Sequence, residues 1–221
     1  MSSIRTNTLP RQQSTSRATT SRDAALSAAV AVILRDGILG MTIEAVAREA
    51  GLSKGGVLYH FSSKDALLRG MLEHFLEAME ADMEASRAAD PIEVGRWMRG
   101  YLKTFFAGTA GVAANLPASQ QRNLHAAMFA AIVINRDLLI PVVQRYGDRW
   151  RIASQNDGVP ASEQLITWLA ADGLWVWEIL GIIPGDGTEK AQIVESLIQR
   201  TLPSSPPSDT KLTSGQEPQS T

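Results

Sequence analysis

Residues 42–64 of the chain read TIEAVAREAGLSKGGVLYHFSSK, and the interpretation of the rest of the chain depends on this stretch. Thr42 is a preferred residue at the start of a helix, and Gly51 is a preferred residue at the end of one. Ser53 then caps a second short helix, so the pattern predicts two short helices joined by a tight turn. This spacing is typical of a helix-turn-helix, whose second helix enters the major groove of DNA.

Four positions in the same stretch break local rules. Lys54 and Lys64 place positive charges at helix N-termini, where cations are disfavoured. Gly55 and Gly56 occupy the first turn of a helix, and a glycine in a helix interior costs about 1 kcal/mol relative to alanine. A DNA phosphate would account for all four, because it pairs with lysine and approaches a bare backbone closely. For these residues alone, the alternative is an ordinary helical hairpin with solvated lysines.

The distribution of charge favours the DNA interpretation, although the net charge of the chain is only −2. Residues 1–70 carry nine basic and five acidic side chains, a net charge of +4, and the remaining residues carry a net charge of −6. A positive first third and a negative remainder indicate that one part of the chain meets an anion and the other does not.

Residues 22–72 resemble the N-terminal DNA-binding module of TetR-family transcriptional regulators. The similar features are a DG before the cap, the pattern T-x-x-x-V-A-x-x-A-G-L-S-K-G, the aromatic Y-H-F and the S-K-D-A-L-L that begins the next helix. Two positions depart from the family pattern. Gly56 stands where the family often has Thr, Ser or Ala, and Leu58 stands where Tyr is commonest, with Tyr59 one residue later.

The resemblance implies a role for each matching position. Thr42 would cap the first helix of the motif and contact phosphate, and Ser53, Lys54, Gly55 and Gly56 would open the recognition helix. Tyr59 and His60 would reach the DNA backbone or the bases, and Lys64 would hold a phosphate. Arg48 is either a further DNA contact or a solvated side chain. The Arg-rich arm before the module either enters a minor groove or serves solubility.

The rest of the chain predicts helices and almost no strand, so we expect an all-α fold. An N-terminal three-helix DNA-binding domain would precede a C-terminal helical domain for ligand binding and dimerisation. Asp90 followed by Pro91 predicts a helix that begins there. The expected units are a disordered arm over 1–19, a helix-turn-helix domain over 20–66, a ligand-binding and dimerisation domain over 67–202 and a disordered Pro/Ser-rich tail over 203–221.

Aromatic residues concentrate in the second domain, where the resemblance implies a small-molecule pocket. We expect a small apolar or amphipathic ligand there, although core packing would also explain each ring. The candidate pocket residues are Trp97, Tyr101, Phe105, His125, Phe129 and Trp168. An acidic stripe on the helix over 63–86 (Glu73, Glu77, Glu80, Glu84) is interpreted as a solvated face rather than a metal site.

The helices over 137–154 and 162–180 resemble the pair that builds the dimer interface of the family. They would form a four-helix bundle around a two-fold axis of a homodimer. The candidate interface residues are Leu165, Leu169, Gly173, Val176 and Leu180.

Other classes of protein fit the sequence less well. The chain has no cysteine, no phosphate-binding loop and no nucleophile elbow, so we expect neither an enzyme nor a cofactor. No apolar run reaches the roughly 18–20 residues that span a bilayer, and no secretion signal is evident, so we expect a cytoplasmic protein with no membrane partner. The prediction is a dimeric, ligand-responsive repressor that binds double-stranded DNA. The alternative is a helical interaction scaffold or small-molecule-binding protein that does not bind DNA.

Overall fold

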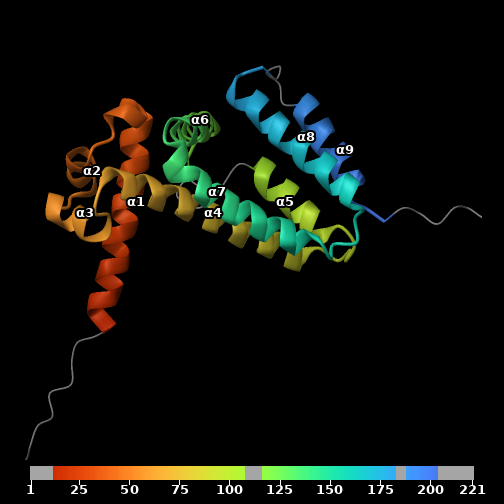
Figure 1. The fold of residues 1–221 in the computed structure, drawn as a ribbon, viewed down its shortest axis with the longest axis horizontal. Helices are drawn as coiled ribbons and strands as arrows, with labels where there is room; N and C mark the ends of the chain where they lie inside the picture. Colours follow the sequence, from red (N-terminus) through yellow and green to blue (C-terminus); the bar gives the residue numbers. More distant parts are fainter. Residues whose placement is uncertain (1–11, 108–115, 183–187, 204–221) are drawn as a thin grey trace, which may run out of the picture.

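The computed structural model describes residues 12–107, 116–182 and 188–203. Within these residues the chain forms helices and no strand (Figure 1). This confirms the predicted all-α fold. The helices are α1 (Gln12–Gly40), α2 (Ile43–Ala50), α3 (Lys54–His60), α4 (Lys64–Ala89), α5 (Arg96–Ala107), α6 (Ala118–Ile134), α7 (Arg136–Ser154), α8 (Ala161–Ile179) and α9 (Thr188–Gln199).

Helix α1 differs from the prediction at both ends. It begins at Gln12, inside the segment 1–19 that was expected to be an arm, and residues 1–11 lie outside the described part. Residues 12–19 contain no proline, so nothing in them prevents a helical backbone. Near the other end the backbone leaves the helical conformation at Gly37, where φ is 74°. A positive φ suits glycine because it has no Cβ, and α1 bends sharply at Gly37.

The helix-turn-helix has the capping residues that the sequence predicts. The Thr42 hydroxyl accepts a hydrogen bond from the Ala45 amide at 3.1 Å, which satisfies a free donor of α2. Gly51 ends α2 in the left-handed conformation, with a φ of 65°. The Ser53 hydroxyl then accepts a hydrogen bond from the Gly56 amide at 3.0 Å at the start of α3. These local bonds set the two ends of the turn.

The DNA-binding module closes on α4. Val46 of α2 and Val57 of α3 are fully buried together with Leu26 of α1 and Leu67 of α4. In Figure 1, α4 runs from the group formed by α1, α2 and α3 toward the other end of the molecule, alongside α7. One continuous helix therefore belongs to both parts of the molecule.

Phe61 fixes the start of α4 against the module. Its ring is 4% exposed and lies against the backbone of α4 at Gly70, where an added Cβ would be 2.5 Å from a ring carbon. The guanidinium of Arg22 lies 5.6 Å from the centroid of the same ring. Gly70 is therefore needed for a close approach between a side chain and a helix backbone.

Helices α5, α8 and α9 build a second apolar cluster at the far end of α4. Helix α5 packs closely along α4, because a Cβ at Gly100 would lie 2.9 Å from the Met83 carbonyl oxygen. Helices α6 and α7 extend the first cluster from α1 along α4. The space between α4, α5, α6, α7 and α8 is not fully filled, as the next section shows.

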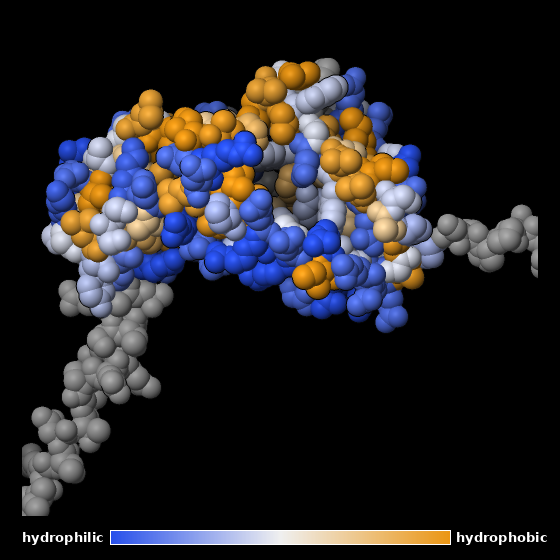
Figure 2. Space-filling view, viewed as in Figure 1, coloured by the Kyte–Doolittle hydropathy of each residue, from blue (hydrophilic) through white to orange (hydrophobic). Residues whose placement is uncertain are grey.

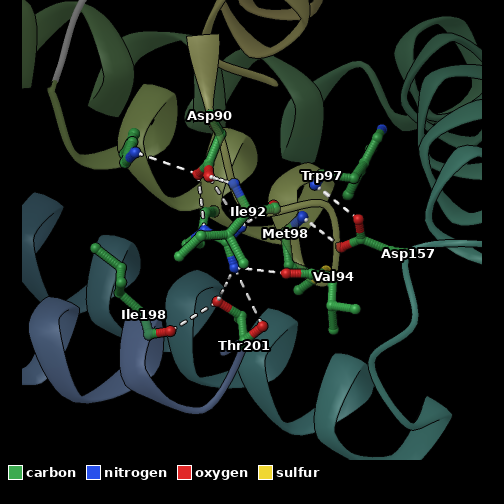
Figure 3. A network of polar contacts seen from close by, with 10 residues as sticks. Asp90, Ile92, Val94, Trp97, Met98, Asp157, Ile198 and Thr201 are labelled. Carbon is green, nitrogen blue, oxygen red and sulfur yellow. Dashed lines mark hydrogen bonds and ion pairs between the residues drawn. The ribbon is translucent and has the colours of Figure 1, made fainter. Parts of the chain in front are cut away.

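A buried arginine joins the two ends of this C-terminal part (Figure 3). Arg99 is 3% exposed, and its guanidinium donates to both carboxylate oxygens of Asp90, at 2.7 and 3.0 Å. It also donates to the carbonyl oxygens of Ile92, Val94 and Thr201. The arginine holds the pKa of Asp90 down at about 2. A buried charge is tolerated only when it is paired and hydrogen-bonded, as it is here.

This network corrects the prediction that a helix begins at Pro91. Helix α5 begins at Arg96, and the Asp90 carboxylate binds Arg99 and the Ile92 amide. The N-terminus of α5 is capped from a distant loop, since the Asp157 carboxylate accepts hydrogen bonds from the amides of Trp97 and Met98, at 2.8 and 2.9 Å. The tertiary contact replaces the local cap that the sequence suggested.

Within the described residues, no single helix is long and apolar enough to cross a membrane. Helices α6 and α7 pass that test only as a pair bent by 115°, on length and composition alone. The predicted tail over 203–221 lies outside the described residues except for residue 203.

Replacing Gly70 by alanine tests the contact between α4 and the module. We expect Gly70→Ala to lower the free energy of unfolding by about 1–3 kcal/mol, because the methyl group overpacks the buried Phe61 ring. Helix propensity alone would raise it by about 1 kcal/mol. Urea unfolding at a fixed protein concentration measures the difference.

Gly147→Ala is the matched control, since Gly147 lies in α7 and no atom lies within 4 Å of an added Cβ. We expect it to be neutral or mildly stabilising. Equal stability of the two variants would show that Phe61 does not press on the α4 backbone.

Candidate nucleic-acid interface and ligand cavity

Helix α3 separates its residues cleanly between the core and solvent. Val57 is fully buried, and Leu58 is half-buried against the same core. Tyr59 is 80% exposed, and its ring meets the His60 ring edge-on with the centroids 5.0 Å apart. The family pattern has Tyr at the position of Leu58. In this chain Leu58 packs against the core, and the Tyr side chain, at position 59, lies on the surface. Tyr59 has no packing role in the described chain that would explain an aromatic side chain on the surface.

The two glycines at the start of α3 are not required by the fold. A Cβ at Gly55 would meet nothing closer than the Ser53 hydroxyl at 3.9 Å, and one at Gly56 would lie 3.3 Å from that hydroxyl. Neither glycine has a positive φ. The absence of side chains therefore leaves a bare, exposed helix N-terminus, which is the environment that anions prefer.

The two lysines at these helix N-termini have partners within the folded chain. The Lys54 ammonium lies 2.6 Å from Glu44 on α2, and this hydrogen bond holds the pKa of Glu44 below its ordinary value. The Lys64 ammonium donates to the Ile38 carbonyl at 3.3 Å. The pair involving Lys54 is exposed, so it contributes little stability and is easily exchanged for a phosphate.

The remaining predicted DNA contacts also lie on the module. Thr42 and Arg48 are exposed on α2, and His60 is half-exposed at the end of α3. The structure thus brings the predicted DNA-binding residues together on α2, α3 and the first residue of α4. The residues are Thr42, Arg48, Ser53, Lys54, Gly55, Gly56, Tyr59, His60 and Lys64.

A cavity of about 400 Å³ lies in the second part of the molecule, between α4, α5, α6, α7 and α8. Figure 2 shows a hollow in the surface between α6 and α7 on one side and α8 on the other. The volume is in the range of pockets that hold organic ligands. The cavity is lined by Leu72, Phe75, Leu76, Met79, Thr104, Phe105, His125, Met128, Phe129, Ile132, Ile140, Val143, Trp150, Asp172, Trp175 and Val176.

Half of the predicted pocket residues line this cavity and half do not. Phe105, His125 and Phe129 line it. Trp97 and Trp168 instead pack against each other at 6.1 Å between ring centroids, and Tyr101 is buried among core residues. Trp97 and Tyr101 share a face of α5 with Phe105, and Trp168 shares a face of α8 with Asp172. Helical spacing does not show how far along these helices the cavity extends, and these three rings lie in the second apolar cluster instead.

The polar groups of the cavity are few. Asp172 lies at its edge and accepts a hydrogen bond from the Tyr101 hydroxyl at 3.0 Å. Burial raises the pKa of Asp172 and lowers that of His125. Two lining residues, Thr104 and Trp150, carry a buried hydroxyl and a buried indole N–H that find no hydrogen-bond partner in the described part of the chain.

Sequence reasoning missed Asp172, Trp150 and the α4 residues of the cavity wall. The α4 stripe of Leu72, Phe75, Leu76 and Met79 has helical spacing, which predicts a core face and not a cavity. The signal for Asp172 was present, because an acidic residue among Trp and Leu in α8 breaks an apolar pattern.

The acidic stripe of α4 is paired with arginines. Glu73 binds Arg145 at 2.7 Å, Glu80 binds Arg149, and both arginines lie on α7. Glu84 binds Arg87 on α4 itself. No group of side chains suited to a metal ion occurs among the described residues. The stripe therefore joins α4 to α7 rather than facing solvent alone.

Helix α8 exposes an unusual amount of apolar surface, which appears as orange patches over α8 in Figure 2. Leu165 is 55% exposed, Leu169 65% and Leu180 64%. Ile166 and Trp177 of the same helix are also exposed. Gly173 is also exposed, and no atom lies within 4 Å of an added Cβ there. Exposed apolar patches of this kind mark surfaces that contact another molecule.

A helix-turn-helix module with an exposed recognition helix, joined by one helix to a domain with an apolar cavity, defines a class of ligand-sensing DNA-binding proteins. Residues 25–71 match the family of bacterial regulatory proteins of the tetR type, and residues 95–202 match the tetracyclin repressor-like C-terminal domain. The chain belongs to the TetR family of transcriptional regulators, and these are transcription factors rather than enzymes.

Solved structures with the same fold agree. A TetR-family transcriptional regulator from Rhodococcus sp. has 17% identity and a TM-score of 0.62, with coverage of 83% of this chain and 99% of that chain. The fatty acid degradation regulator FadR from Bacillus halodurans has 14% identity and a TM-score of 0.57, with coverage of 80% and 97%. The multidrug binding protein EbrR complexed with malachite green has 19% identity and a TM-score of 0.61, with coverage of 83% and 98%. Among curated protein sequences no significant match was found.

Proposed function

We propose that this regulator is a dimeric repressor, that each α3 reads one half-site of a near-palindromic operator, and that a small apolar or amphipathic ligand in the cavity releases it. The observation that carries the proposal is the continuity of α4. Lys64 begins this helix beside the recognition helix, and Leu72, Phe75, Leu76 and Met79 of the same helix form a wall of the cavity.

The surface of the module supports contact with DNA. The bare N-terminus of α3 offers backbone amides to a phosphate, and Lys54 can exchange Glu44 for it. Tyr59 projects from the exposed side of the recognition helix. Phosphate contacts would position the module and contacts from α3 would read the bases. Since the partner is chromosomal DNA, we expect the protein to act in the cytoplasm.

The packing around α4 supports control by a ligand. The ion pairs from Glu73 and Glu80 tie α4 to α7, and the cavity lies between these helices and α5, α6 and α8. A ligand that prefers one separation of these helices shifts α4, and the Phe61 contact passes the shift to the module. The distance between the two recognition helices of the dimer then no longer matches the distance between the half-sites, which is about one turn of DNA or more.

The apolar surface of α8 supports a dimer. Leu165, Leu169, Gly173, Val176 and Leu180 follow one another at helical spacing, and Gly173 leaves room for a close approach by a second helix. Together with α7, two copies would form a four-helix bundle around a two-fold axis.

The complex of the multidrug binding protein EbrR with malachite green supports the idea that this fold can hold small organic ligands.

In vitro selection on random DNA duplexes tests the proposal directly. The purified full-length protein is used at about 150 mM salt, where non-specific binding is weak. We expect enrichment of an inverted repeat with half-sites for two modules. A folded dimer that enriches no sequence would favour the alternative, a helical scaffold or small-molecule-binding protein without DNA readout.

Tyr59→Ala tests the role of the recognition helix. Because the side chain is 80% exposed, we expect no change in thermal stability. We expect binding to the selected duplex to weaken about ten-fold, close to 1.4 kcal/mol. Fluorescence anisotropy with labelled duplex measures the affinity.

Leu39→Ala is the matched control for Tyr59→Ala, since Leu39 is 81% exposed in the same module at the end of α1. We expect it to bind DNA as the unmodified protein does. If Tyr59→Ala also binds normally, the exposed face of α3 is not the reading surface.

Leu169→Glu tests the dimer face. Two copies of the new carboxylate would meet near the two-fold axis in an apolar contact, so we expect the dimer to weaken by at least about a hundred-fold. Sedimentation velocity at micromolar concentration would then show monomers. Ile193→Glu, at a 42% exposed position on α9, should leave the dimer intact. Dimers for both variants would show that α8 is not the interface.

A further inference from the structure

We infer that the cavity binds a lipophilic organic cation, whose positive charge pairs with the carboxylate of Asp172. The inference rests on the proposed function, in that it takes this cavity as the ligand site, and it names the chemical class of the ligand. The argument depends on which charges line the cavity, how Asp172 is held and which rings surround it.

Among the described residues that line the cavity, Asp172 carries the one formal charge, and none of these residues is a lysine or an arginine. His125 is the other titratable lining residue, and its burial lowers its pKa, which keeps it uncharged near neutral pH. Lys190 lines a smaller neighbouring hollow, and its ammonium lies in an ion pair with Glu178 at 2.7 Å. An anionic ligand would find no counter-charge in this cavity, whereas a cation would.

The Asp172 carboxylate is oriented but not saturated. The buried Tyr101 hydroxyl donates to Oδ1 at 3.0 Å and holds the side chain at the edge of the cavity. A carboxylate offers about four acceptor positions, so this single donor leaves room for further partners. The residue is partly exposed, and the partial burial of its carboxyl group raises the pKa of Asp172. A cation bound beside it would favour the charged form of the carboxylate.

Aromatic rings surround the same space. Trp175 lies one turn after Asp172 on α8, and its ring centroid is 5.9 Å from those of both Phe105 and Phe129. Phe75 and Trp150 line the cavity from α4 and α7. The faces of such rings attract organic cations, and aromatic enclosures are the common way to recognise them.

A second polar point in the cavity wall lies on α5, one turn after Tyr101. Thr104 is 7% exposed, and its hydroxyl has no hydrogen-bond partner within the described residues. A buried hydroxyl without a partner costs about 1–3 kcal/mol. A ligand that carries an N–H group as well as its charge would satisfy it. An unpartnered polar group in an apolar wall is a feature of a binding site rather than of a core.

Asp172 also lies near the apolar face proposed for the dimer, so a partner arginine is the competing counter-charge. The two cases differ in what the loss of the carboxylate disturbs. Removing it would weaken cation binding in the first case and dimerisation in the second. The test therefore includes the oligomeric state.

Two probes of nearly equal size and shape and opposite charge provide the experiment. Binding of tetraphenylphosphonium and of tetraphenylborate to the full-length protein is measured by titration calorimetry in sodium buffer. We expect the cation to bind at least about ten-fold more tightly than the anion. Equal affinities, tighter binding of the anion or no binding of the cation would overturn the inference.

Asp172→Asn keeps the shape of the side chain and removes its charge. We expect it to weaken tetraphenylphosphonium binding at least about ten-fold and to leave tetraphenylborate binding no weaker. Asp82→Asn is the matched control, since Asp82 is exposed on α4 away from the cavity and loses the same charge. Unchanged cation binding by Asp172→Asn, or a loss of dimers by sedimentation with cation binding intact, would overturn the role of Asp172.

Binding of the selected duplex separates this inference from the proposed function. Circular dichroism and sedimentation check that Asp172→Asn is folded and dimeric. Cation binding by a protein that selects no duplex would overturn the repressor proposal and leave the ligand assignment standing. Operator binding by a protein that does not prefer the cation would overturn the ligand assignment and leave the repressor proposal standing.

Discussion

The contact between the Phe61 ring and the α4 backbone at Gly70 is the constraint on which the rest of the structure depends. It leaves no room for a side chain on the helix, so the DNA-binding module packs directly against the α4 backbone. The same helix continues for several turns into the C-terminal part, where its apolar residues face the cavity and its acidic residues pair with α7. One helix therefore contacts both the DNA-binding module and the cavity.

The C-terminal part is held at its far end by a different kind of interaction. Arg99 binds Asp90 and the carbonyl oxygen of Thr201, and Asp157 caps α5 from the loop between α7 and α8. These contacts fix α5, α9 and the α7–α8 loop around the end of α4 (Figures 1 and 3). The cavity lies between α4, α5, α6, α7 and α8. A rigid end and an unfilled middle are suited to a domain in which a ligand changes the packing of a few helices.

Sequence reasoning was most reliable where the signal is local. Thr42, Gly51 and Ser53 cap the helices as predicted, because each acts on backbone groups within a few residues. It failed where partners come from far along the chain. The Asp90–Pro91 pair looks like a helix start, but Arg99 takes the carboxylate and Asp157 supplies the cap. The lysines seemed unpaired because Glu44 and the Ile38 carbonyl approach them only in the folded chain.

The sequence by itself determined the all-α class, the helix-turn-helix and the membership of a family of DNA-binding regulators. Helix caps, glycine turns and apolar spacing are properties of short segments, and they survive in any packing. Only the tertiary structure decided which aromatic rings enclose a cavity and which fill the core. The neighbouring helices fix how far the cavity extends along each helix, so Asp172 and Trp175 line it, whereas Trp168, one turn earlier on α8, packs against Trp97. The side chains that line the cavity can therefore be identified only in the folded chain, where residues from five helices come together.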